Sequence, residues 1–193
     1  MVADPDQVKI MPGLSCIVGR TAEEAEEQYE YLQSLIHPLV AREILSMVLG
    51  HVDLSPYPLD GPMPEDLPLS NASQSTFRNV MDMARKEKLT MKDVALRVAG
   101  ARGKAVVKGS PQDIADQMEE WFRNGGCDGF NVMPPHLPGG LDDFVGLVLP
   151  ELRRRGLFRT EYQGQTLRAH LGFERPPSRY ACAGPRTSTT AVA

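Results

Sequence analysis

The residue types that most often carry catalysis or bind metals, cysteine and histidine, are few and widely spaced in this sequence. The three cysteines form no C-x-x-C pair and lie at Cys16, Cys127 and Cys182. The four histidines form no i, i+4 pair and no H-E-x-x-H motif, and lie at His37, His51, His136 and His170. Zinc sites and dithiol redox motifs require close spacing of such residues. The sequence therefore predicts neither a metal site nor a redox dithiol built by this chain alone.

One turn has the residue types of an anion site. Residues 108–112, Lys-Gly-Ser-Pro-Gln, run from a predicted strand into a predicted helix, where free amides and the positive end of the helix dipole attract anions. The same residues suit an ordinary helix cap, with Ser110 at the cap and Pro111 in the first turn. Glycine-rich phosphate motifs are absent from the chain. An ordinary cap is the favoured interpretation, with an anion site as the alternative.

The first third of the chain predicts one strand, two helices and a long irregular segment. Residues 8–19 predict a strand with a Pro-Gly break, and the capping box of Thr21 and Glu24 opens a helix over 22–36. A second helix begins at Pro38 and ends at Gly50. Residues 51–72 contain five prolines and sustain neither helix nor strand. Such a long loop is either a functional lid or a surface insertion without chemistry.

The rest of the chain predicts helices and strands in alternation. Two apolar runs predict strands buried on both faces, at 103–109 and 130–133. Helical periodicity is found over 75–88, 90–101, 111–125 and 141–152. On the helix that begins at Pro111, one apolar stripe is expected, made of Ile114, Met118, Trp121 and Phe122. Strand and helix thus alternate with short connections, which is typical of a parallel sheet.

Three parallel strands are too few for a complete fold of this kind. A closed barrel of parallel strands needs eight strand–helix units and about 250 residues, whereas this chain has 193. With 41% hydrophobic residues, the composition is that of a folded chain. The sequence therefore looks like one end of a larger fold.

The charge and the motifs disfavour nucleic-acid and membrane partners. The net charge of −4 argues against a surface that tracks phosphates. Residues 89–100 resemble the first helix of a helix-turn-helix, but a strand follows where a recognition helix would be required. No apolar run approaches the roughly 20 residues of a membrane span, and no leader peptide is recognisable. We expect a cytoplasmic protein with neither a nucleic-acid nor a membrane partner.

Nine motifs in chain order resemble the C-terminal part of the nitrilotriacetate monooxygenase component A family, a branch of the bacterial luciferase-like, flavin-dependent monooxygenases. They are VKIMPG at 8–13, VGRT at 18–21, SQS at 73–75, GSP at 109–111, DGFNVMPP at 128–135, LPGGLDDF at 137–144, PEL at 150–152, RGLFRTEY at 155–162 and LR at 167–168. The resemblance implies an α/β fold, the C-terminal portion of a TIM-like (β/α)8 barrel comprising about strands six to eight. It assigns residues 1–172 to this barrel part, with a helical and loop insertion over about 37–102. Residues 173–193 are expected to form a disordered tail.

The family resemblance also implies an activity. Family members insert one atom of dioxygen into a small organic substrate, with reduced FMN supplied by a separate flavin reductase. Their phosphate cradle and most flavin contacts match no residue of this chain, so no catalytic or cofactor-binding residue is transferred. The chain alone is therefore expected to be inactive and to bind FMN poorly.

The rim of strand eight maps onto Asn131, Met133 and His136, which barrel geometry would direct toward flavin or substrate. A lone histidine in a loop is more often a surface residue, and that alternative stays open for His136. The alternative function is a self-associating half-barrel, a structural or binding module that needs a separate N-terminal half.

Overall fold

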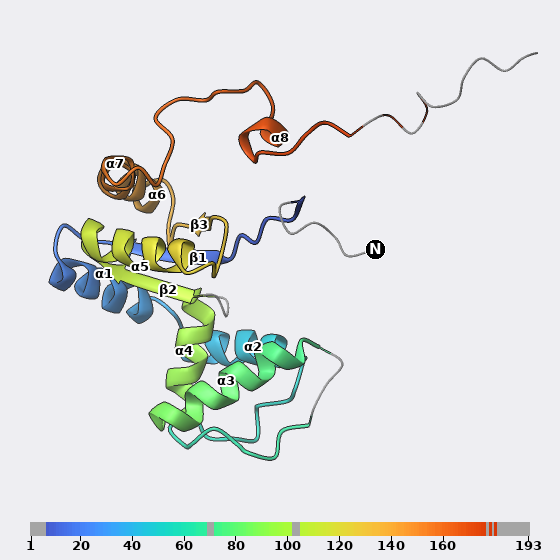
Figure 1. Ribbon diagram of the computed structural model, residues 1–193. Coiled ribbons are helices and arrows are strands. Elements are labelled where there is room, and N and C mark those ends of the chain that lie inside the picture. The colour runs from blue at the N-terminus through green and yellow to red at the C-terminus, as the bar shows by residue number, and fades with distance from the viewer. Residues whose placement is uncertain (1–6, 69–71, 102–104, 177, 179, 181–193) are drawn as a thin grey trace, which may run out of the picture. The chain divides into compact units, whose positions relative to one another are not determined.

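The computed structural model describes residues 7–68, 72–101, 105–176, 178 and 180. It divides into two compact units: Ile10–Phe158, and a smaller unit formed by the described residues of Met1–Lys9 and Arg159–Ala193. In chain order the larger unit contains β1 (Gly13–Val18), α1 (Ala22–Ser34), α2 (Pro38–Val48), α3 (Gln74–Glu87), α4 (Met91–Ala101), β2 (Ala105–Gly109), α5 (Pro111–Arg123), β3 (Asn131–Met133), α6 (Gly139–Asp143), the π-helical turn Phe144–Val148 and α7 (Leu149–Arg154). The smaller unit contains α8 (Leu167–His170) (Figure 1).

The sheet of the larger unit is parallel, and β1 is its central strand. The strand order is β2-β1-β3, with Leu14 opposite Ala105 on one side and opposite Val132 on the other. Three parallel strands in an α/β arrangement confirm the prediction from the sequence. The pairing does not follow chain order, however. In a barrel each strand lies between the strands before and after it, so consecutive numbering as strands six, seven and eight would have placed β2 in the centre.

Helices cover both faces of this sheet, as a parallel sheet requires. Leu14, Cys16 and Val18 of β1 point to one face and pack in a common core with α5, the π-helical turn and α7. Ser15 and Ile17 point to the opposite face, as alternation along a strand dictates, and α1 lies on that side. All five of these β1 side chains are buried.

The strands β1 and β2 are shorter than the sequence indicated, and the edge strand β2 is also more exposed. We predicted that the strand over 103–109 would be buried on both faces, yet Ala105, Val106 and Lys108 are exposed, and residues 103 and 104 lie outside the described part. The reason is position, because β2 is an edge strand with a single neighbour. The predicted strand over 8–19 likewise shrinks to Gly13–Val18, since Pro12 has no N–H to give to a ladder.

The helices begin where their capping residues stand. Thr21 accepts a hydrogen bond from the Glu24 amide at the start of α1, and Ser73 does the same for Thr76 at α3. Thr90 and Asp93 cap α4 reciprocally. These caps are local in sequence, which is why the helix positions are confirmed to within two or three residues.

Two helices differ in detail from their predictions. Phe122 is not part of the buried stripe of α5 but is 48% exposed, whereas Trp121 is half-buried and its ring lies 6.2 Å from that of Phe130. The last predicted helix, over 141–152, begins two residues earlier and contains the π-helical turn Phe144–Val148. Pro150 follows this turn, and its missing N–H removes one regular helical hydrogen bond.

The helices α2, α3 and α4 pack against one another and enclose a second hydrophobic core (Figure 1). The proline-rich segment 51–68 belongs to this core and is no mere surface insertion. Its buried side chains are Val52, Leu54, Met63 and Leu67. The segment is thus irregular in backbone but fixed by apolar burial.

We predict that Leu54→Ala lowers the free energy of unfolding by about 2–4 kcal/mol, because a side chain 2% exposed would leave a cavity in the core. Urea unfolding followed by circular dichroism measures this change. Leu39→Ala, at a 49% exposed position on α2, is the matched control and should change stability by about 0.5 kcal/mol or less. Equal effects of the two substitutions would show that segment 51–68 does not contribute to the core.

Candidate functional site

The carboxyl-terminal edge of the sheet is the first place to look for a site. Because the three strands are parallel, their last residues Val18, Gly109 and Met133 lie at the same edge, where ligands of α/β proteins most often bind. The turns after β1 and β2 are joined directly, because the Gly19 amide donates a hydrogen bond to the Gly109 carbonyl at 3.1 Å. Gly19 also needs to be glycine, since a Cβ there would lie 2.6 Å from the Thr21 carbonyl oxygen.

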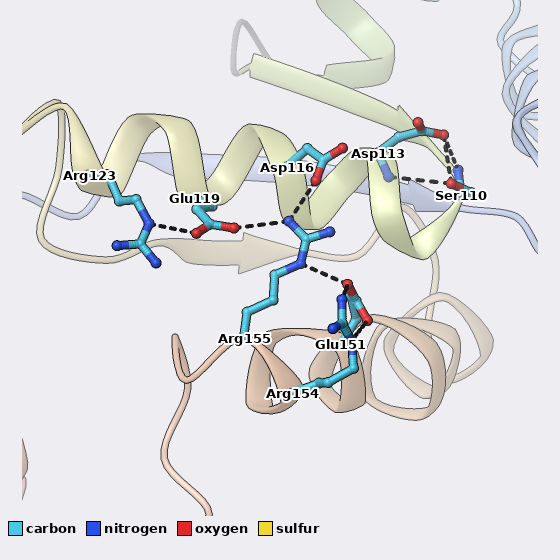
Figure 2. Close-up of polar contacts among 8 residues, drawn as sticks. All are labelled: Ser110, Asp113, Asp116, Glu119, Arg123, Glu151, Arg154 and Arg155. Atoms are coloured by element: carbon cyan, nitrogen blue, oxygen red, sulfur yellow. Dashed lines mark hydrogen bonds and ion pairs between the residues drawn. The ribbon is translucent and has the colours of Figure 1, made fainter.

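The turn with anion-site composition is occupied by the chain's own carboxylate. Both the amide and the hydroxyl of Ser110 donate to Asp113 Oδ2, at 2.9 and 2.7 Å, and the Asp113 amide donates back to Ser110 Oγ (Figure 2). The hydrogen bonds from Ser110 lower the pKa of Asp113. The favoured interpretation, an ordinary helix cap, is what the structure shows. An added anion would meet a carboxylate that already holds these donors.

A network around Arg155 ties the helix that follows β2 to the helix that follows β3. Its guanidinium contacts Asp116 at 2.6 Å and Glu119 at 3.0 Å on α5, and Glu151 at 2.7 Å on α7 (Figure 2). Hydrogen bonds from Arg154 and then Arg155 lower the pKa of Glu151 to about 2. The Arg155 side chain is only 14% exposed, so this network is shielded from water more than an ordinary surface pair. It fixes α5 against α7.

The three residues predicted for the rim of the last strand have different environments. Asn131 is exposed, and its Nδ2 donates to the Met11 carbonyl at 2.9 Å, so it fastens the segment before β1. Met133 is half-buried and lies opposite Ser15 in the sheet register. His136 is exposed in the loop before α6. A role of these side chains toward flavin or substrate stays a prediction.

The two cysteines within the described residues, Cys16 and Cys127, offer no activated nucleophile. Burial raises the pKa of the Cys16 thiol to about 12, and burial also raises that of Cys127. Cys182 lies outside the described residues. Within the described part of the chain, no group of three His, Cys, Asp or Glu side chains is placed to hold a metal ion.

No pattern in the sequence indicated a hollow on the face of the sheet that points away from α5 and α7. A cavity of about 270 Å³ lies where β1, α1 and α4 meet, and its lining includes Ser15, Gln33 and Gly100. A larger one of about 620 Å³ adjoins it through the shared residues Tyr29 and Val106. At the larger cavity, Lys108 pairs with Glu26 at 2.6 Å and lies 4.2 Å from the centre of the Tyr29 ring. These residues are far apart in the sequence, so no local pattern could have brought them together.

Comparison with known proteins relates this chain to part of several larger ones. The chain is 48% identical over 179 residues to N-acetyl-S-(2-succino)cysteine monooxygenase of Bacillus subtilis (strain 168), covering 92% of this chain and 41% of that protein. It is 45% identical to nitrilotriacetate monooxygenase component A of Aminobacter aminovorans, over 91% of this chain and 39% of that protein. The chain thus spans about 40% of the length of the curated relatives it matches. No protein-family model matches it.

Solved structures give the same relationship. The crystal structure of DmoA from Hyphomicrobium sulfonivorans superposes with a TM-score of 0.71 and 29% identity, covering 86% of this chain and 34% of that one. Riboflavin lyase (RcaE), solved with modified FMN and riboflavin, superposes with a TM-score of 0.67 and 33% identity, over 88% of this chain and 36% of that one.

Among the described helices of the present chain, none has the length and apolarity to cross a bilayer.

The Arg155 network predicts a specific acid sensitivity. The pKa of Glu151 falls from an ordinary value of 4.5 to about 2 on folding, so its ionised form stabilises the fold. That contribution is present above about pH 4.5 and is lost as the pH falls toward 2. Glu151→Gln should therefore weaken the pH dependence of the free energy of unfolding between pH 5 and 2, as measured by urea unfolding at each pH. The exposed Glu120→Gln on α5 is the control, and identical pH profiles for the two variants would contradict the prediction.

Proposed function

Because the chain is a partial homologue of the nitrilotriacetate monooxygenase component A family of luciferase-like monooxygenases, we propose that it forms the C-terminal part of a two-component, flavin-dependent monooxygenase. In the proposed reaction one atom of dioxygen enters a small organic substrate and the other leaves as water. The electrons come from reduced FMN supplied by a separate flavin reductase. The observation that carries the proposal is the 48% identity over 179 residues.

The fold agrees with this relationship. The α/β class predicted from the sequence, a portion of a TIM-like barrel, is confirmed by the superposition at a TM-score of 0.71. In such barrels the chemistry takes place at the carboxyl ends of the strands. The turns after β1 and β2, linked by Gly19 and Gly109, are the portion of that edge that this chain would contribute.

The turn after β2 does not fit a flavin phosphate. At the turn after β2, Asp113 already accepts the hydrogen bonds of the Ser110 amide and hydroxyl. A phosphate placed there would face this negative charge without a free donor from Ser110. We therefore derive no step through FMN for this chain alone, and the proposal assigns the phosphate contacts to the part of the relatives that this chain does not match.

The test has two arms, of which the first uses the chain alone. The purified chain should retain no stoichiometric FMN after gel filtration, and it should show no substrate-dependent oxygen consumption with a flavin reductase and NADH. In the second arm, the matching region of the Bacillus subtilis relative is replaced by this chain. That chimera should oxygenate N-acetyl-S-(2-succino)cysteine when the reductase is supplied. Absence of turnover by a folded chimera would contradict the proposed function.

Two glycines provide matched variants of the chimera. Gly19→Ala should abolish turnover, because the added Cβ would collide with backbone atoms at the start of α1. Gly146→Ala should leave turnover unchanged, because among the described residues nothing beyond its chain neighbours and the backbone of its own helix lies within 4 Å of the added Cβ. Equal activity of both variants would show that the edge at Gly19 is not part of the working site.

A second candidate function, a self-associating module, is favoured by the open edges of the sheet. In the described part of the chain β2 and β3 each have a single neighbouring strand, and free strand edges favour pairing with another chain. Three exposed apolar residues follow β3 in the chain at intervals of four positions, Leu137, Leu141 and Val145. Open strand edges and exposed apolar side chains are features that pairing with a second copy or with a separately encoded barrel half would cover.

Light scattering coupled to gel filtration tests self-association. We expect a mass of twice the 21.3 kDa chain, and Leu141→Glu should shift it to the mass of one chain. Leu39→Glu introduces the same charge at an exposed position of α2 and should leave the dimer intact. A single 21.3 kDa species at every concentration would contradict this second function and would not affect the first.

A further inference from the structure

The larger cavity has the size and the apolar surface of a site for a small molecule. Its volume is about 620 Å³, and ligand pockets of proteins measure about 300–1,000 Å³. Its walls come from four elements, α1, α3, α4 and β2, and α1 contacts both α4 and β2. The apolar part of the lining consists of Val80 and Met83 of α3, Val98 and Ala101 of α4, and Val106 of β2. A ligand with an apolar body could therefore pack against this surface.

Three charged side chains line the same cavity, namely Lys108, Arg97 and Glu26. Solvent reaches all three, because their side chains are 37%, 41% and 47% exposed, respectively. Two positive charges thus stand against one negative charge in the lining. A ligand that carries a single negative charge would balance the excess.

Both cations keep hydrogen-bond donors that a ligand can use. Lys108 Nζ contacts the two carboxylate oxygens of Glu26, at 2.6 and 2.5 Å, and lies over the ring of Tyr29. An ammonium group has three N–H donors, so at least one remains. Arg97 donates to Glu87 through Nη1 alone, at 2.6 Å, and Glu87 does not line the cavity. Because a guanidinium has five N–H donors, the cavity differs from the turn after β2, where one carboxylate accepts from both donors of the serine.

From these observations we propose that the larger cavity binds a small monocarboxylic acid, in its ionised form, with an apolar or aromatic body. The carboxylate accepts hydrogen bonds from the remaining donors of Lys108 and Arg97, and the body packs against Met83 and Val98. Hydrogen bonds to a charged acceptor are stronger than those to a neutral one, so a carboxylate is preferred over a neutral group of the same shape. An ammonium compound is excluded, because it would face two cations.

This binding site does not rest on the proposed monooxygenase function. Its test uses the chain alone, whereas the monooxygenase test uses turnover by the chimera. Each can therefore fail without affecting the other.

Benzoate is the probe, and the full chain labelled at the methionine methyl groups is the sample. The sequence has nine methionines, of which Met83 lines the cavity, whereas Met118 and Met133 are not among its lining residues. Two-dimensional proton–carbon NMR should show a saturable shift of the Met83 signal and none for Met118 or Met133. The dissociation constant should be on the order of 1 mM, as suits a ligand of this size. Absence of a saturable Met83 shift would overturn the proposal.

Two analogues test the chemistry in the unaltered protein. Benzamide keeps the shape of benzoate but carries no charge, and should bind about fivefold more weakly or worse. Benzylamine is a cation at neutral pH and should produce no saturable shift. Equal affinity for benzoate and benzamide would overturn the proposal, as would saturable binding of benzylamine.

Three substitutions test the assigned residues. Lys108→Gln and Arg97→Gln should each weaken benzoate binding about fivefold or more, because each removes a charged donor. Glu26→Gln should strengthen binding about threefold, because it removes the carboxylate that competes with the ligand for Lys108. Loss of folding cannot imitate this pattern, since Glu26→Gln and Lys108→Gln break the same ion pair but are expected to change the affinity in opposite directions.

Arg85→Gln is the matched control for the two cations. It removes the same charge from α3 at a side chain that is 63% exposed and does not line the cavity. Benzoate affinity should change less than about twofold in this variant. Equal weakening by Arg85→Gln and Arg97→Gln, or weaker binding in Glu26→Gln, would overturn the assignment.

Discussion

The constraint on which the rest of the structure depends is the position of β1. A parallel strand needs hydrogen-bonding partners along both edges and apolar cover on both faces. Among the described strands, β1 meets all of these requirements, with β2 and β3 beside it and helices above and below. The alternation of its side chains then assigns separate roles to the two faces. Leu14, Cys16 and Val18 build the core with α5 and α7, while Ser15 and Ile17 form the floor of the cavity.

The two hydrophobic cores explain how so small a sheet is supported. One core lies between the sheet and the helices that follow β2 and β3, where Arg155 adds ion pairs at its margin. The other is built by α2, α3, α4 and the segment 51–68, with no strand residue among its buried members. The helix α4 belongs to this second core through Val94 and Val98, and it also lines the cavity through Ala99 and Gly100. The cavity under α1 is therefore located between this second core and the sheet face that carries Ser15 and Ile17.

The open strand edges and the filled turn at Ser110 both agree with the partial coverage of the chain's relatives. The chain spans about 40% of those proteins, and it has two strand edges with no neighbour in the described part. At the turn with anion-site composition, the Ser110 amide already donates its hydrogen bond to Asp113. These features agree with the proposed role as one portion of a flavin-dependent monooxygenase, in which the chain would supply part of the active-site edge and the rest of the protein the phosphate contacts.

The sequence by itself determined what depends on neighbouring residues. The caps at Thr21, Ser73 and Ser110 set the helix starts. The alternation of strand and helix indicated the fold class, and nine short motifs in chain order indicated the family. Tertiary structure decided what depends on distant residues. The central place of β1, the exposure of Val106 on an edge strand, and the meeting of Ser15, Gln33 and Gly100 around one cavity all required the packed chain. Capping is a contact between residues three positions apart, whereas burial and sheet order arise only when segments far apart in the chain come together.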